Sequence, residues 1–251
     1  MRSARRRGSA HVDGSTAHTV RRPIANARAA IAGIRKNPDD PETQTEQAFN
    51  LIEEMIVTLE LPPGTSVSEA TLSAKTGIGR MPIRMALKRL EHMGLVTSLA
   101  RKGAFIRPIS VEDQLAILEV RRPVERMLAC KTARLATDAQ REALRSNVDA
   151  MLQSARTGDL QKYLQFDSIC DRIIYETSRN PFAIEFVTLL YSHSRRYWVS
   201  RSKGTDWVRT AELHKEMMYA IADGDEVRTA RASDALIDYL EATCKASIGV
   251  Y

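Results

Sequence analysis

The sequence predicts a mainly α-helical protein in two parts, and three observations support this prediction. Apolar residues recur at helical spacing through most of the 251 residues. Two short β-like runs, 95–98 and 104–107, lie on either side of a basic turn. From residue 111 to residue 248 the chain has no convincing strand and only two prolines, Pro123 and Pro181. We therefore expect a small unit over residues 41–108 and a helical bundle over residues 111–248.

The composition is ordinary for a globular protein, with 43% hydrophobic and 27% charged residues. The sequence has no apolar run of about 18 residues that could cross a membrane, and its N-terminus lacks the apolar core of a secretory signal. We therefore expect a cytoplasmic protein without a membrane partner. Three widely spaced cysteines, Cys130, Cys170 and Cys244, argue against a disulfide framework and against a zinc ribbon.

Residues 1–40 form a basic tail with nine Lys or Arg residues against three acids, which equals the formal charge of +6 of the whole chain. Because the tail contains Gly, Ser and Thr and has little periodicity, we expect it to be mostly disordered. Its arginines could strengthen non-specific attraction to DNA, since each neutralised phosphate releases a counterion. An inert extension is the alternative interpretation.

The small unit begins with a predicted helix over residues 45–59, whose apolar stripe can brace the helices that follow. Ser68 is suited to cap the start of a short second helix, and Gly77 and Gly79 end that helix. A third helix then begins near Arg80.

On this third helix, Arg80, Arg84 and Lys88 share the face opposite the apolar stripe. Two helices joined by a tight glycine turn are typical of a helix-turn-helix, whose second helix enters the major groove of DNA. The β-like runs then form a hairpin with Lys102 and Gly103 at its tip, a basic wing that can touch phosphate or the minor groove. A solvated basic helix followed by an ordinary hairpin is the alternative.

Six short motifs follow one another between residues 45 and 107 of this unit. They read Pro62-Pro63-Gly64, Ser68-Glu69, Gly77-Ile78-Gly79-Arg80-Met81-Pro82-Ile83-Arg84, Ala86-Leu87-Lys88-Arg89-Leu90, Gly94-Leu95-Val96 and Gly103-Ala104-Phe105-Ile106. Together they resemble the winged-helix domain of the GntR family of bacterial transcription regulators. The resemblance implies a winged helix-turn-helix of three helices plus a short β-hairpin, bound to an operator in double-stranded DNA.

The resemblance also implies which residues meet DNA, with Arg80 and Arg84 on the recognition helix and Gly103 in the wing as the usual contacts. Two positions depart from the family pattern, because Ala70 stands where the family commonly has Arg and Met81 where it commonly has Thr. We therefore expect an operator that differs from the common type, or weaker binding. The expected DNA-binding residues are Ser68, Glu69, Arg80, Met81, Arg84, Lys88, Lys102 and Gly103.

The larger part is predicted to be an antiparallel α-helical bundle of about six helices. Each helical segment has an apolar face, and the loops between segments are short, as antiparallel neighbours require. The predicted helices cover residues 111–136, 138–156, 159–178, 181–202, 206–223 and 225–247.

Three groups of motifs lie on these helices. They are Glu119-Val120-Arg121-Arg122 with Glu125, then Phe166-Asp167 leading to Ser178-Arg179-Asn180-Pro181, and His214-Lys215 through Ala220-Ile221 to Gly224-Asp225. This half resembles the FCD domain, the all-α ligand-sensing domain of one large GntR subgroup. The resemblance implies a domain that binds an effector and forms a dimer.

Many domains of this type hold a divalent metal with an Asp, a His four residues on, and two further histidines. Asp167 matches the first ligand and His214 the third, but Asp171 and Leu236 stand in place of the other two histidines. Asp167, Asp171 and His214 could together bind a hard cation, yet they lack the fourth ligand of a zinc site. The alternatives are a surface Asp167 paired with Arg172 and a hydrogen-bonded interior His214.

If the metal is absent, the effector needs other groups to hold it. Arg121, and Arg195 or Arg196 beside Tyr197 and Trp198, suit this role, because a guanidinium matches a carboxylate and an aromatic wall adds apolar area. A small organic acid is therefore the expected effector, and a basic patch facing solvent or another helix is the alternative. The expected effector-binding residues are Arg121, Asp167, Asp171, Arg195, Arg196 and His214.

The expected function is that of a dimeric, ligand-responsive transcription regulator of the bacterial nucleoid. An enzyme that uses the two aspartates and His214 is a rival, but the sequence lacks a nucleophile elbow, a phosphate loop and a complete metal tetrad. A DNA-organising protein driven by the basic tail is another. Salt dependence separates these DNA-binding functions, because a non-specific binder loses its affinity for all DNA together.

Overall fold

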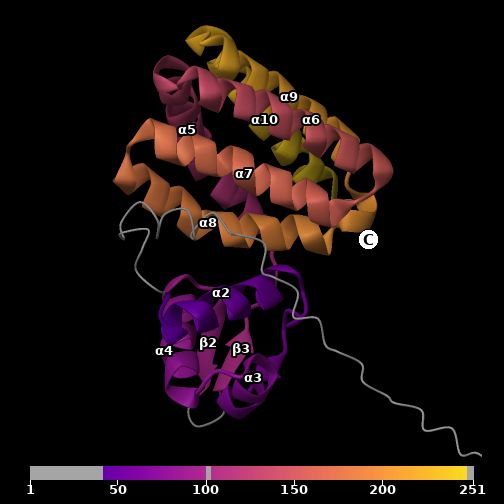
Figure 1. The fold of residues 1–251 in the computed structure, drawn as a ribbon. Coiled ribbons are helices and arrows are strands. Elements are labelled where there is room, and N and C mark those ends of the chain that lie inside the picture. The colour runs from indigo at the N-terminus through magenta and orange to yellow at the C-terminus, as the bar shows by residue number, and fades with distance from the viewer. Residues whose placement is uncertain (1–41, 100–102, 248–251) are drawn as a thin grey trace, which may run out of the picture.

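The computed structural model describes residues 42–99 and 103–247 and consists of a small α/β unit beside a larger bundle of helices (Figure 1). The expectations for the tail over residues 1–40 and for Lys102 lie outside the described residues. Within the described ranges, no helix is both long and apolar enough to cross a lipid bilayer. The mainly α-helical fold class is confirmed.

In the small unit, the described residues form three helices and three short strands. They are α2 (Gln44–Val57), β1 (Ser66–Val67), α3 (Glu69–Thr76), α4 (Arg80–His92), β2 (Val96–Leu99) and β3 (Gly103–Ile106). The strands form an antiparallel sheet in the order β1-β3-β2, with Val96 opposite Ile106 and Ser66 opposite Phe105. The sequence predicted only the hairpin of β2 and β3. A two-residue strand such as β1 is too short to show the alternation that identifies a strand.

Helix α2 starts with a capping box, in which the side chains of Thr43 and Glu46 each bond to the backbone of the other residue. It ends at Val57, two residues before the predicted end at residue 59. Leu59 has a φ of 62°, in the left-handed region, and therefore cannot continue a right-handed helix. The buried residues Ile52 and Ile56 turn the apolar stripe of α2 toward α4.

Helices α3 and α4 form the expected helix-turn-helix. The Ser68 hydroxyl accepts a hydrogen bond from the backbone N–H of Thr71 at 3.0 Å, and this cap fixes the first turn of α3. Gly77 ends α3 in the left-handed conformation, at a φ of 73°. The apolar stripe of α4 is buried against the core of the small unit and consists of Ile83, Ala86, Leu87 and Leu90.

The bundle contains the six predicted helices, whose ends differ from the expected ones by at most two residues. They are α5 (Val111–Leu135), α6 (Asp138–Thr157), α7 (Leu160–Ser178), α8 (Pro181–Ser200), α9 (Trp207–Asp223) and α10 (Glu226–Ala246). A short 3₁₀ turn, η1 (Ser202–Gly204), follows α8 and was not predicted.

Every helix of the bundle begins at a polar side chain that accepts a hydrogen bond from a backbone N–H three residues ahead. This arrangement satisfies one of the free N–H groups that each helix start leaves. The six caps are Ser110, Thr137, Asp159, Asn180, Asp206 and Asp225. These local signals explain why the predicted boundaries were close to the observed ones.

The buried apolar residues form two separate cores, one in each part of the molecule. Figure 1 shows that α8 is the helix of the bundle nearest to the small unit, where it lies along α2. Helix α8 therefore belongs to the bundle and also forms the surface on which the small unit rests.

We expect Gly103→Ala to destabilise the small unit strongly. Gly103 has a φ of +97°, and an added Cβ would lie 2.1 Å from the carbonyl oxygen of Val67 in β1. Gly77→Ala is the matched control, because Gly77 also has a positive φ of +73° but nothing lies within 4 Å of its added Cβ. The control should cost about 1–2 kcal/mol of backbone strain, and Gly103→Ala roughly 1–3 kcal/mol more. Denaturant unfolding of both variants tests this, and equal losses would contradict it.

Candidate functional site

Six of the eight expected DNA-binding residues line one groove between α3, α4 and the wing. They are Ser68, Glu69, Arg80, Arg84, Lys88 and Gly103. Met81 is 61% exposed on α4 but does not line the groove, and Lys102 lies outside the described residues. The sequence motifs therefore converge in space as a helix-turn-helix with a wing requires.

Arg84 is held across the groove by Glu69. Its Nε and Nη2 atoms donate to the two carboxylate oxygens of Glu69, each at 2.8 Å. The hydrogen bond from Arg84 is the largest cause that lowers the pKa of Glu69, so the carboxylate stays charged. This two-point pair fixes the plane of the guanidinium, while 51% of the Arg84 side chain remains exposed.

Glu91, an acidic residue of α4, does not line the groove. Its carboxylate accepts hydrogen bonds from the backbone N–H of Ser98 at 2.7 Å and from the Ser98 hydroxyl at 2.6 Å. These bonds lower the pKa of Glu91 and tie β2 to α4. Arg80, Arg84 and Lys88 therefore face only one acid, Glu69, among the residues that line the groove.

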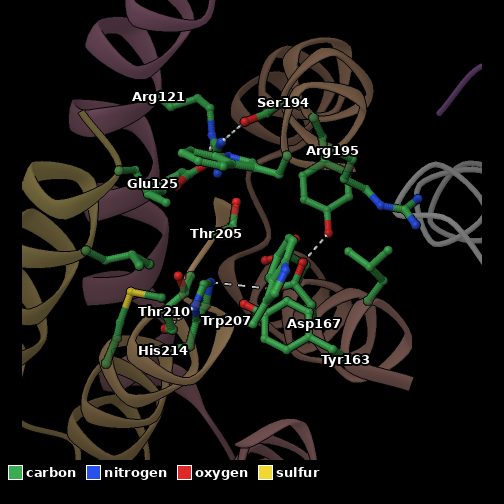
Figure 2. Close-up of a pocket in the computed structure, with 17 residues that line it drawn as sticks. Arg121, Glu125, Tyr163, Asp167, Ser194, Arg195, Thr205, Trp207, Thr210 and His214 are labelled. Atoms are coloured by element: carbon green, nitrogen blue, oxygen red, sulfur yellow. Dashed lines mark hydrogen bonds and ion pairs between the residues drawn. The ribbon is translucent and has the colours of Figure 1, made fainter. Parts of the chain in front are cut away.

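A second concave site lies inside the bundle. This cavity has a volume of about 70 Å³ for the centres of water-sized molecules and is lined by residues of α5, α7, α8, α9 and α10 and by Thr205 (Figure 2). This space admits a small molecule of a few heavy atoms, since a single water needs roughly 10–15 Å³ on the same measure. Most of the aromatic area comes from Tyr163, Tyr191, Trp198 and Trp207.

Arg121 lies at one end of the cavity, where α5 and α8 meet. Its Nε donates to Glu125 at 2.5 Å and its Nη1 to the Ser194 hydroxyl at 2.6 Å. Figure 2 shows Arg121, Glu125 and Ser194 gathered on the same side of the cavity. The guanidinium is 12% exposed at its side chain and keeps Nη2 free of any hydrogen bond within the described residues. This end can receive an acceptor such as a carboxylate oxygen.

Asp167 and His214 lie on the opposite side (Figure 2). Asp167 accepts a hydrogen bond from the Tyr191 hydroxyl at 2.7 Å and lies 3.5 Å from Nε2 of His214. His214 is oriented by the carbonyl of Thr210, 2.9 Å from its Nδ1. The partners of Asp167 are thus Tyr191 and His214 rather than Arg172.

Asp171 also lines the cavity, where it is near Arg121 and Glu125 as well as Asp167. Burial raises the pKa of Asp171 well above its ordinary value, and the neighbouring Asp167 and Glu125 raise it further, while Arg121 lowers it. Asp171 therefore keeps its negative charge only if a cation or a strong donor reaches it.

Asp167, Asp171 and His214 do not fit the expected metal. Leu236, which replaces the fourth ligand, lines the cavity with an apolar side chain. In the part of the chain that the structure describes, no three His, Cys, Asp or Glu side chains are grouped closely enough to hold a metal ion. Asp167, Asp171 and His214 share a cavity but not a coordination geometry, and zinc favours a closed set of four ligands.

The guanidiniums of Arg195 and Arg196 are not in the positions expected for binding an effector in the cavity. The stem of Arg195 lines the cavity, but its guanidinium points away from the other labelled side chains (Figure 2) and lies 3.7 Å from Glu54 of α2. Arg196 does not line the cavity and donates to the backbone carbonyl of Arg107. Burial, together with Arg107, lowers the pKa of Arg196 to about 10. Of the two arginines that line the cavity, Arg121 is therefore the one whose guanidinium forms hydrogen bonds with other cavity residues.

Helix α8 connects the cavity to the small unit through adjacent residues. Tyr191, Ser194 and Arg195 line the cavity. Ser192 donates to Glu53 of α2, and Nε2 of His193 lies 2.6 Å from the carbonyl oxygen of Met93, directly after α4. Sequence reasoning missed these contacts. Their signal was the polar run at 192–196, which is unusual on a helix that is largely buried.

We expect purified protein to contain well under one zinc per chain after dialysis, because the cavity supplies too few ligands in the expected positions. Chelator should neither unfold the protein nor abolish DNA binding. Leu236→His adds an imidazole to the cavity wall and should raise the zinc content. Elemental analysis of both proteins is the measurement. Stoichiometric zinc in the unaltered protein would contradict the prediction.

Comparison with known families matches both parts of the chain. Residues 44–106 match the family described as bacterial regulatory proteins, gntR family, and residues 116–239 match the FCD domain. The Nta operon transcriptional regulator of Aminobacter aminovorans is 30% identical over 167 residues, which are 66% of this chain and 76% of that protein. The transcriptional repressor RspR of Escherichia coli K12 is 25% identical over 200 residues, 77% of this chain and 86% of RspR.

Solved structures agree in fold. E. coli McbR/YncC superimposes with a TM-score of 0.75 at 16% identity, over 83% of this chain and all of that one. A GntR regulator from Rhodococcus sp. RHA1 has a TM-score of 0.64 at 18% identity, over 84% of this chain and all of that one. The Nta operon regulator and RspR are transcription regulators, which sets the enzyme alternative aside. The chain belongs to the GntR family of bacterial regulatory proteins and carries an FCD domain after its DNA-binding domain.

Proposed function

We propose that this protein is an operator-binding regulator whose affinity for DNA changes when a small organic acid enters the cavity of the bundle. The observation that supports this most directly is the double role of α8. It lines the cavity with Tyr191, Ser194 and Arg195, and it contacts the small unit with Ser192, His193 and Arg195. A ligand that moves α8 therefore changes the support of the DNA-reading helices.

The acid binds through Arg121 in this proposal. The guanidinium of Arg121 is partly buried, its Nη2 is free, and Ser194 beside it offers a hydroxyl. A carboxylate in this position gains a charge-assisted hydrogen bond in a region of low dielectric constant. Because Ser194 belongs to α8, the ligand also contacts the helix that supports the small unit.

Two copies of the chain act together on DNA. One helix-turn-helix reads a half-site of a few base pairs, and family members of this kind gain specificity by placing two recognition helices about one helical turn apart. A homodimer with two-fold symmetry meets this requirement on a palindromic operator in the cytoplasm.

The test uses the intergenic DNA upstream of the protein's own gene. Fluorescence anisotropy with labelled fragments should reveal one fragment bound in preference to competitor DNA, and a panel of small carboxylates should contain one that changes this affinity. Equal binding to every fragment, lost together as salt rises, would favour the DNA-organising alternative. A preferred fragment that no ligand affects would remove the effector from the proposal.

We expect Arg84→Ala to weaken binding to the operator by about 1–3 kcal/mol more than binding to random DNA, because Arg84 is fixed by Glu69 and remains exposed toward the groove. Lys75→Ala is the matched control, since Lys75 lies on α3, pairs with Glu60 and does not line the groove. The control should change both affinities slightly and alike. Titrations at one salt concentration decide this, and equal losses for Arg84→Ala would reduce Arg84 to a phosphate contact.

We expect Glu54→Gln to reduce the effect of the ligand on operator affinity at least about twofold. The affinity for operator without ligand and the affinity for ligand without operator should stay nearly unchanged. Glu54 is the α2 partner of Arg195, and it lies in a buried environment that raises its pKa. Glu60→Gln is the control, because Glu60 lies in the same unit but pairs with Lys75. Operator titrations with and without ligand give the coupling. A variant that couples as well as the control would exclude this contact from the signal.

A further inference from the structure

The charges that line the cavity do not balance. Arg121 is already engaged with Glu125 at 2.5 Å, and the guanidinium of Arg195 lies near Glu54 outside the cavity. Asp167 and Asp171 remain, and within the described residues neither forms an ion pair with a Lys or Arg side chain. Among the described residues, Asp167 therefore has His214 as its ion-pair partner and Asp171 has none, although Arg121 is near enough to lower the pKa of Asp171.

A second observation in the same cavity points to a ligand. Tyr163 is only 3% exposed and lines the cavity, and its hydroxyl has no hydrogen-bond partner in the described part of the chain, although it is not one of the fully buried polar atoms that lack a partner. The hydroxyl is therefore open to the cavity, where a ligand can supply the missing hydrogen bond. Tyr163 packs edge to face against Trp207 with 4.9 Å between ring centroids, so its ring cannot simply turn toward solvent. Figure 2 shows Tyr163, Trp207, Asp167 and His214 on the same side of the cavity.

A resident metal ion does not supply the missing positive charge. Leu236 presents an apolar side chain where the metal would need a further ligand. An organic ammonium group needs no fixed coordination geometry. It needs carboxylates, a hydroxyl and aromatic faces, and the cavity provides all three in Asp167, Asp171 and Tyr163 with the neighbouring aromatic rings.

We propose that the effector is a zwitterionic amino acid, with its ammonium group bound by Asp167 and Asp171 and its carboxylate bound by Arg121 and Ser194. This inference rests on the proposed function, which supplies the carboxylate end, and adds the second charge of the ligand. A zwitterion bonds to Arg121 through its carboxylate and to the aspartates through its ammonium group, whereas a simple acid leaves the two aspartates without a cation. The aromatic walls between the ends accommodate the carbon chain or contact the ammonium group.

The test compares ligands that differ in one charged group. Isothermal titration calorimetry with the full chain would use common L-amino acids and short straight-chain ω-amino acids. Each is measured beside the acid that lacks the amino group and the amine that lacks the carboxylate. We expect at least one amino acid to bind about tenfold or more tightly than both of its analogues, as a charge-assisted hydrogen bond at each end implies.

Asp171→Asn serves as the variant, because the amide cannot become charged when an ammonium group approaches, and its shape is almost the same. It should reduce the preference for the amino acid over its deaminated analogue to about threefold or less, while the deaminated acid binds as before. Asp149→Asn is the matched control, since Asp149 lies on the same bundle but outside the cavity and pairs with Lys215. Circular dichroism and binding to operator DNA establish that both variants are folded.

The outcomes separate this inference from the proposed function. A deaminated acid that binds as tightly as its amino acid and changes operator affinity overturns the ammonium site and leaves the proposed function intact. An amine that binds as tightly as the amino acid overturns the zwitterion. A panel in which no compound binds overturns both the inference and the acid effector. An unchanged preference in Asp171→Asn removes Asp171 from the site.

Discussion

The buried polar residues of α8 need hydrogen-bond or ion-pair partners on two sides of the helix. Helix α5 supplies partners on one side and α2 on the other. Ser194 accepts hydrogen bonds from Arg121 and Gln114 of α5. Ser192 donates a hydrogen bond to a carboxylate of α2, and Arg195 forms an ion pair with another. A buried polar group without a partner costs more than a typical hydrogen bond gains. The bundle and the DNA-binding domain therefore depend on each other's side chains for the stability of α8, which separates this contact from an ordinary surface between two domains.

The contact is also incompletely satisfied. Nε and Nη2 of Arg195 and Nε of Arg196 are buried and have no hydrogen-bond partner in the described parts of the chain. Both guanidiniums belong to the boundary between the domains, where a small displacement could supply new acceptors. Such a boundary differs from a fully bonded core, because more than one arrangement of α8 against α2 can have similar free energy. A regulator needs two arrangements of this kind, and a rigid core would provide only one.

The sequence predicted those parts of the structure whose signals are local. Helix starts follow from single capping residues such as Ser68 and Asp206, and the groove of the DNA-binding domain follows from motifs that lie close together in the chain. The sequence could not predict where Arg195 and Arg196 point, because neighbouring residues on a helix face different directions. Only the packing of α8 on α2 determines which of these directions is toward the cavity and which is toward the DNA-binding domain. The link from Tyr191 to Asp167 spans 24 residues and likewise depends on tertiary packing.

The capped helix starts of the bundle have a mechanical consequence. Because Asn180 holds the first turn of α8 and comparable caps hold its neighbours, none of these helices can lengthen or unwind at its start without breaking a hydrogen bond. A disturbance at the cavity is thus carried along α8 as the tilt or slide of a stiff rod about 30 Å long, since its 20 residues rise by about 1.5 Å each. A rod of that length turns a small change at Ser194 into a measurable displacement at its far end, around Phe182 on the exposed surface.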